Sequence, residues 1–251
     1  MQINPRFIAL MLAVAAASAC STDSIIDPSD RPDPPPAEAF DLDLSFFDET
    51  TPAPNGATTA WAQALQTVAA AQSDMAMLEV TEALLRAAAS ATATRQDQHW
   101  SWPFSTTIDG DPYDGRLRST VAGNEYEWNL FVTAPQHSPQ LSDYLWAQGY
   151  TQPGNDEGLW WLVDAEAGTD TIVAAVSWFR NLEDGINFGF SDSDSTRWMF
   201  ERASAGNVLT WMVFNQPRRR ITWFPASGTG QTWTSATNNA CWDENQHDIA
   251  C

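Results

Sequence analysis

Glu125 and Glu127 are the residues whose type and spacing come nearest to acid–base chemistry. They stand two residues apart in an alternating segment, so on a β-strand both carboxylates leave one face about 7 Å apart. Inverting glycosidases separate their two catalytic carboxyl groups by a similar distance. Glutamate pairs on the exposed face of a strand are usually only solvated. We therefore expect no catalysis from this pair, and glycan hydrolysis is kept as the second alternative function.

Other motifs that carry chemistry are incomplete or missing. Asp109, Asp111 and Asp114 lie in the run D-G-D-P-Y-D-G, but Tyr113 stands where a calcium loop needs its third ligand. The sequence has no G-x-S-x-G, no H-E-x-x-H and no phosphate-binding glycine loop. We predict a turn at the aspartates, and we expect no enzyme activity, no cofactor and no bound metal.

The charge balance excludes one class of partner and isolates one basic cluster. The chain has 12 Lys+Arg, all of them Arg, against 32 Asp+Glu, a net charge of −20 that repels nucleic-acid phosphates. Arg218, Arg219 and Arg220 form the one basic cluster, directly after Gln216 and Pro217. Guanidinium groups bind phosphate and carboxylate well. These three residues are candidates for an anion site, such as one for a lipid headgroup; the alternative is a turn with solvated side chains.

Residues 1–20, MQINPRFIALMLAVAAASAC, have the layout of a secretory signal. Arg6 is followed by an apolar stretch and by small residues before Cys20. This arrangement resembles the lipobox of bacterial lipoproteins, although Ala17 stands where Leu is more usual. The resemblance implies removal of signal peptide 1–19 and lipidation of Cys20, so that the chain is exported and bound to the membrane through its lipid anchor. Because Ser21 rather than Asp follows, the resemblance further implies the outer membrane of the cell envelope.

The two remaining cysteines lie at the C-terminus. Exported chains usually pair such cysteines, so Cys241 and Cys251 are expected to form a disulfide that closes the tail 241–251. The alternative is a zinc site with His247 as a third ligand. We disfavour zinc because the segment offers no clear fourth ligand.

Residues 20–56 are expected to be a disordered tether between the lipid and a single domain, 57–251. Seven of the 15 prolines fall between residues 21 and 56, together with nine acidic residues and Arg31. Extended at ~3.3 Å per residue, such a spacer reaches on the order of 100 Å. An apolar patch interrupts it and is expected either to dock on the domain or to recruit a partner; its residues are Phe40, Leu42, Leu44, Phe46 and Phe47.

Within the domain, hydrophobic periodicity predicts helix followed by sheet. Residues 57–95 are rich in Ala and Leu at helical spacing, and Asp74 could mark a break between two helices. Residues 97–240 contain short runs of aromatic and β-branched residues between turn clusters, which is typical of antiparallel strands. Several of these runs are apolar on both sides. The predicted fold class is α+β, mainly β: an N-terminal helical segment packed on a curved antiparallel β-meander, a partial barrel of roughly eight to eleven strands.

The predicted function follows from the anchor and from the aromatic sheet, since 12 of the 13 Trp fall between residues 100 and 242. We expect a non-catalytic envelope lipoprotein that binds an apolar or carbohydrate ligand, or an envelope protein partner. A periplasmic carrier or assembly factor for lipids or lipoproteins is the alternative. The candidates for lining a ligand pocket are Trp128, Trp160, Trp178, Trp198, Trp211 and Trp223.

Overall fold

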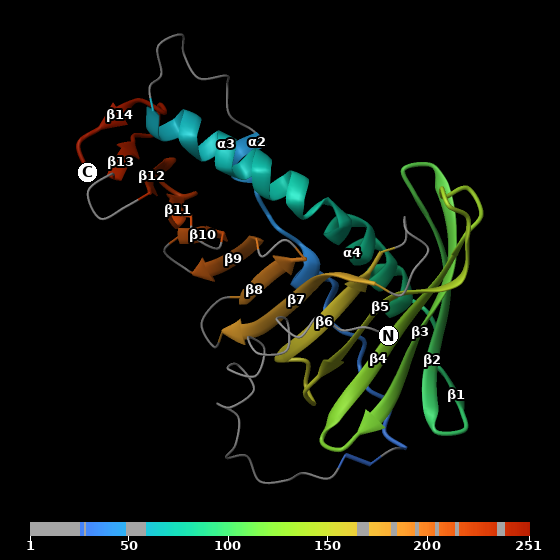
Figure 1. Ribbon diagram of the computed structural model, residues 1–251. Helices are drawn as coiled ribbons and strands as arrows, with labels where there is room; N and C mark the ends of the chain where they lie inside the picture. Colours follow the sequence, from blue (N-terminus) through green and yellow to red (C-terminus); the bar gives the residue numbers. More distant parts are fainter. Residues whose placement is uncertain are drawn as a thin grey trace. The chain divides into compact units, whose positions relative to one another are not determined.

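The computed structural model describes residues 26–27, 29–48, 59–164, 171–181, 185–193, 196–203, 206–213, 216–234 and 239–251 (Figure 1). The signal peptide 1–19, the lipidation candidate Cys20 and Ser21 lie outside the described residues. What the sequence predicts for them therefore stays a prediction.

The structure is mainly β, with a 14-stranded antiparallel sheet whose strand order follows the sequence from β1 to β14. β1 and β14 are its edges, so the sheet is not closed. The strand number exceeds the predicted eight to eleven because very short strands, such as β1 and β14, leave no hydrophobic pattern to read. The first seven strands are β1 (Thr94–Gln96), β2 (His99–Ile108), β3 (Asp111–Ala122), β4 (Glu125–Ala134), β5 (Leu141–Thr151), β6 (Glu157–Val163) and β7 (Ile172–Asn181). The other seven are β8 (Gly185–Asp192), β9 (Thr196–Ala203), β10 (Gly206–Val213), β11 (Arg219–Phe224), β12 (Thr229–Trp233), β13 (Asn239–Trp242) and β14 (Asp248–Ile249).

The chain divides into two compact units. The first combines Met1–Pro35 with Ala87–Ala174, and the second combines Pro36–Arg86 with Ala175–Cys251. The boundaries expected from the sequence, a tether over residues 20–56 and a single domain over 57–251, stay a prediction.

Along β4, in the first unit, buried side chains alternate with half-buried ones. Trp128, Leu130 and Val132 are buried, whereas Glu127 and Asn129 between them are half-buried, as the sequence pattern predicts. The indole Nε1 of Trp128 donates a hydrogen bond to Thr151 Oγ1 at 2.9 Å. One buried polar group of the core is therefore satisfied within the sheet.

The aspartate run 109–114 forms a hairpin turn and the strand that follows it. Asp109 and Gly110 have φ angles of 53° and 91° between β2 and β3, the left-handed backbone that a two-residue hairpin turn requires. Asp114 accepts a hydrogen bond from the hydroxyl of Ser105 at 2.6 Å. These residues build the hairpin, as predicted.

The proline-rich segment 29–35 follows an ordered path on the first unit. The side-chain amide of Asn155 donates to the backbone carbonyls of Asp33 and Pro34, each at 2.9 Å, and Pro32 and Pro35 are buried. In the structure, this part of the predicted tether therefore contacts the folded unit. Proline supplies no N–H, but its extended backbone still presents carbonyls that a donor on the folded unit can reach.

The described helices lie in the second unit, except for the last residues of α4, which fall in the first. They are the 3-10 helix η1 (Ala37–Phe40) and the α-helices α2 (Ser45–Asp48), α3 (Thr59–Asp74) and α4 (Ala76–Ala89). The helical pattern is interrupted at Met75, as expected near Asp74. Asp74 also accepts a hydrogen bond at 3.0 Å from the indole Nε1 of Trp198 in β9, which satisfies a second buried indole.

An aromatic cluster joins the apolar patch of the N-terminal segment to α3 and to the strands. The ring of Phe47 lies 5.4 Å from that of Trp61 and 5.2 Å from that of Trp223, and Trp61 lies 5.4 Å from Trp242. Phe40 lies 5.7 Å from Trp178. The patch therefore docks on the protein, one of the two expected alternatives: Phe40, Leu44 and Phe47 are buried, while Leu42 and Phe46 are half-buried.

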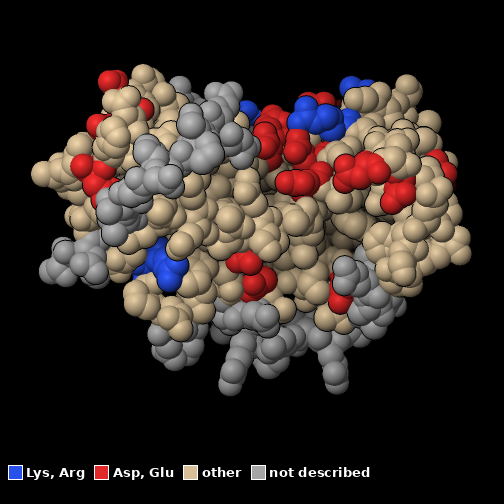
Figure 2. All heavy atoms as spheres, turned by 90° about the horizontal axis from the view of Figure 1, so that it is seen from above, with Lys and Arg blue, Asp and Glu red and all other residues tan. Residues whose placement is uncertain are grey.

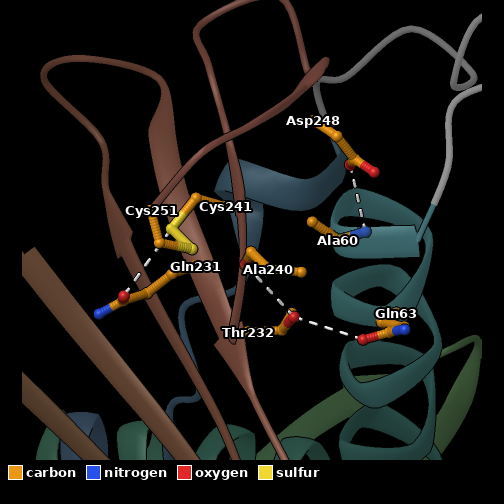
Figure 3. The surroundings of a disulfide bond; sticks show 8 residues. All are labelled: Ala60, Gln63, Gln231, Thr232, Ala240, Cys241, Asp248 and Cys251. Carbon is orange, nitrogen blue, oxygen red and sulfur yellow. Dashed lines mark hydrogen bonds between the residues drawn. A yellow bond between two sulfur atoms is a disulfide. The ribbon is translucent and has the colours of Figure 1, made fainter. Parts of the chain in front are cut away.

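Cys241 and Cys251 form a disulfide across a sequence separation of ten residues, as the sequence predicts. Because the bridge uses both thiols, the alternative zinc site is lost. Figure 3 shows β14 folded back beside α3, where Asp248 Oδ1 accepts a hydrogen bond at 3.3 Å from the backbone N–H of Ala60. The tail thereby supplies an acceptor to the first turn of α3, whose N–H groups have no partner within the helix.

Replacing Asn155 tests the docking of the proline-rich segment. Asn155→Asp keeps the shape and tolerates the left-handed φ of 58°, but it places a carboxylate against two carbonyl oxygens. We expect the free energy of unfolding to fall by about 2 kcal/mol at pH 7, the scale of two lost hydrogen bonds, measured by urea denaturation. Asn207→Asp, at a half-buried position of β10, is the matched change away from this segment. An equal effect of both substitutions would contradict the docking by Asn155.

Opening the disulfide tests the role of the tail. Cys251→Ser should lower the free energy of unfolding by about 2–3 kcal/mol, because the loop of ten residues no longer restricts the unfolded chain. The same denaturation series on the wild type with and without reductant measures this effect. Unchanged stability, or two free thiols in the oxidised protein, would show that the bridge does not form.

Candidate functional site

Five of the six Trp candidates for a ligand pocket lie in the core. Their exposed fractions are 2% or less: Trp128, Trp160, Trp178, Trp198 and Trp223. The sixth, Trp211 of β10, is half-buried and lines a cavity. The structure therefore does not bring the six indoles into one pocket, and Trp211 alone of the six borders this cavity.

This cavity, which we call the α3 groove, lies in the second unit and has a volume of about 480 Å³. It is bordered by α3, by the ends of β10, β11 and β12, and by the turn before β11. Its lining residues are Gln63, Gln66, Thr67, Trp211, Gln216, Pro217, Arg219, Arg220, Ile221, Thr232, Trp233 and Thr234. The lining combines aromatic rings, amides, hydroxyls and guanidinium groups.

Strand register fixes which side chains face α3. Trp211 pairs with Arg219, and Ile221 pairs with Thr232. Since side chains two apart on a strand, and those directly opposite on its neighbour, share a face, these four lie on one face of the sheet. The hydroxyl of Thr232 donates to Gln63 Oε1 at 3.4 Å (Figure 3), so this is the face toward α3.

The guanidinium of Arg219 lies over the indole of Trp211. Its Cζ lies 4.8 Å from the ring centroid, within the range of a cation–π contact. Trp211 in turn lies 6.1 Å from the buried Trp198, its partner on β9 and its neighbour on the same face of the sheet.

The predicted basic cluster is divided by the strand. Arg219 and Arg220 line the α3 groove, whereas Arg218 does not. Arg220 pairs with Thr210 and Trp233, and by alternation its side chain starts from the opposite face of the sheet. Of the three candidates, Arg219 is therefore the one whose position on the strand directs it to the face toward α3.

The α3 groove differs from the chain as a whole, which is strongly acidic, in the charge of its lining. Figure 2 shows acidic side chains outnumbering basic ones on the face in view. Among the described residues that line the groove, none is Asp or Glu. Elsewhere Arg86 pairs with Glu82, Arg116 with Asp143 and Arg202 with Asp43. Arg219 makes no such ion pair within the described part of the chain.

Sequence reasoning did not identify the helix residues of the groove. Gln63 and Gln66 lie three apart on α3, one turn of the helix, and both are exposed. Polar residues at this spacing on an Ala-rich helix read as an ordinary solvated face. Only the pairing of α3 with β12 shows that these amides border a cavity. The glutamate pair lies outside the groove, where Glu125 accepts from Gln152 Nε2 at 2.7 Å.

A second, acidic cavity of about 260 Å³ lies between segment 40–45 and the helices, lined in part by Asp41, Asp43, Glu79 and Glu82. Burial, together with the neighbouring Glu82 and Asp43, raises the pKa of Asp41. Hydrogen bonds from Ser45 lower the pKa of Asp43. No group of three or more His, Cys, Asp or Glu among the described residues is arranged to hold a metal ion.

Comparison with known proteins gives no relative: no protein family, no curated protein and no solved structure matches this chain. None of the helices formed by the described residues has both the length and the apolar character needed to cross a membrane.

The acidic cavity makes a prediction about pH. Because the pKa of Asp41 is raised in the folded protein, folding is disfavoured when this carboxyl is ionised and gains stability as pH falls through the folded pKa. Asp41→Asn should therefore be more stable than wild type at pH 7, with the difference vanishing below about pH 3.8, the ordinary value for Asp.

Asp43→Asn is the matched control with the opposite sign. Its lowered pKa stabilises the fold above the ordinary value, and this stability is lost as pH falls through the folded pKa. This variant should be less stable than wild type at pH 7 and equal to it in strong acid. Urea denaturation at several pH values measures both; the same sign for both variants would show that the electrostatic interpretation is wrong.

Proposed function

We propose that this protein is a lipoprotein of the bacterial cell envelope, exported and held in the outer membrane by lipid on Cys20, which binds a glycan in the α3 groove without catalysis. The observation that carries the binding function is the exposed side of Trp211 beside guanidinium and amide groups in a cavity of about 480 Å³. The signal-like residues 1–20 carry the localisation.

The composition of the groove favours a sugar over a purely apolar ligand. A sugar ring presents C–H groups on its faces and hydroxyls on its edges, so it suits an aromatic platform flanked by polar side chains. Trp211 and Trp233 supply aromatic surface to the lining, and Gln63, Gln66 and Arg219 supply hydrogen-bonding groups beside it. An apolar ligand would remove these polar groups from water without replacing their hydrogen bonds, which costs free energy.

We also propose that the helical segment covers one face of a curved sheet in the second unit, as a partial barrel requires. The contacts that support this are the ring contact between Trp61 and Trp242 and the hydrogen bond from Trp198 to Asp74. In this arrangement the sheet buries its apolar residues against α3. The groove lies between the helix and the ends of the strands.

The alternatives are less well supported by this groove. A carrier of acyl chains needs an apolar cavity, whereas this lining is rich in amides and guanidinium groups. A glycan hydrolase needs two converging carboxyl groups, and the described lining contains none. A protein partner remains an outcome that the binding experiments below can reveal.

The anchor can be tested by expressing the full chain in a Gram-negative host. The mature wild type should gain the mass of a diacylglycerol and an acyl chain on Cys20, lose residues 1–19 and partition into detergent. Cys20→Ser should remove the acyl mass and the partitioning, because a single thiol accepts the first lipid. A wild-type protein that keeps its leader, or a mature chain without acyl mass, would contradict the anchor.

The groove can be tested on an array of neutral and acidic bacterial glycans. Trp211→Ala should weaken binding to any captured glycan by about tenfold, the scale of one good aromatic contact, measured by calorimetry. Trp146→Ala is the matched control, since Trp146 of β5 is half-buried and outside the groove. Equal losses in the two variants would remove the groove as the binding site, and an array without any bound glycan would refute glycan binding itself.

A further inference from the structure

We infer that the ligand of the α3 groove carries a negative group, a carboxylate or phosphate, which is bound by Arg219 on its Trp211 platform. This inference rests on the proposed glycan-binding function and narrows the ligand class to acidic glycans. It is carried by the contact of Arg219 with Trp211, by the absence of carboxylates from the described lining and by the neutral donors around this contact.

The contact with Trp211 places the Arg219 guanidinium beside the groove, where an oxyanion can bind it. A guanidinium offers two parallel N–H donors at its edge, which match the two oxygens of a carboxylate or phosphate. With Cζ at 4.8 Å from the indole centroid, the cation–π contact with Trp211 favours side-chain conformations of Arg219 that keep its guanidinium beside the ring. A guanidinium fork restrained in this way loses less conformational entropy when the anion binds.

The charges around Arg219 leave its N–H donors available to a ligand. Three other arginines of the described chain are paired with carboxylates, but Arg219 makes no ion pair among the described residues, and its groove has no acidic lining. The net charge of −20 would repel an anion at long range. Exposed charges are screened beyond about 8 Å at physiological ionic strength, so the local cations Arg219 and Arg220 determine what binds.

The remaining lining fits the uncharged part of an acidic sugar. Gln63 and Gln66 reach the groove from α3, and Thr232 and Thr234 border it from β12 and the residues that follow. Amide and hydroxyl groups both donate and accept hydrogen bonds, as ring hydroxyls require. The α3 groove thus combines a guanidinium that can bind an anion, aromatic side chains, and uncharged groups that can bind sugar hydroxyls.

The test uses two probes with the same sugar backbone, one with free carboxylates and one with these carboxylates neutralised as methyl esters. Tetragalacturonic acid and its fully methyl-esterified form are titrated by calorimetry into the full chain, purified in a neutral detergent, after the glycan array has been read. We expect the array to retain acidic glycans only, and the acid tetramer to bind at least about tenfold more tightly than the ester, the scale of one charge-assisted hydrogen bond. Arg219→Gln should remove this preference, while Arg219→Lys should keep part of it because charge remains without the fork. Arg218→Gln, the matched change outside the groove, should alter binding only slightly.

Each outcome separates the inference from the function on which it rests. Equal binding of acid and ester, or an array that retains neutral glycans, overturns the inference and leaves glycan binding in place. An array with no bound glycan refutes the proposed function. In that case phosphatidylglycerol added to the detergent is the second probe: binding that Arg219→Gln abolishes would show that the oxyanion is a lipid headgroup phosphate, and absence of binding would overturn the anion site altogether.

Discussion

The packing of aromatic rings on one face of the second unit's sheet is the constraint on which the rest of that unit depends. Phe47 lies between Trp61 of α3 and Trp223 of β11, and Trp61 reaches Trp242 of β13. Leaving such rings in water would be costly, since burying one aromatic side chain is worth about 1.5–3 kcal/mol. These contacts connect α3 to β11 and β13. On the same helix, Gln63 accepts a hydrogen bond from Thr232 at the groove that Trp211 also lines.

Much of the sheet could be predicted from local sequence patterns. Where the prediction from sequence failed, the cause was physical. The alternation of β4 and the turn at Asp109 and Gly110 follow directly from the sequence. Very short strands such as β14 carry no period to detect. The ordered path of residues 29–35 depends on Asn155, 121 residues away from Pro34. The sequence of the proline-rich segment does not show that the side-chain amide of a distant Asn will donate to its carbonyls. Its proline-rich, acidic composition alone therefore predicts a disordered tether.

The candidate site was predicted only in part, because its contacts depend on strand pairing and tertiary packing. Strands that are apolar on both faces do not reveal which indoles are core, and five of the six chosen Trp proved to be buried. Trp211 and Arg219 were both among the candidates, but their contact depends on the pairing of β10 with β11. Gln63 and Gln66 gave no signal, because a helix face becomes a binding surface only when tertiary packing places it beside one.

The central claim is that ligand binds at Trp211 and not at another of the 13 Trp. The most direct measurement is fluorine NMR of the full chain labelled with fluorotryptophan, with Trp211→Phe identifying the resonance of Trp211. Adding a glycan retained by the array should shift the Trp211 resonance and leave those of the buried Trp128 and Trp160 in place. A ligand that binds without moving the Trp211 resonance would contradict this account.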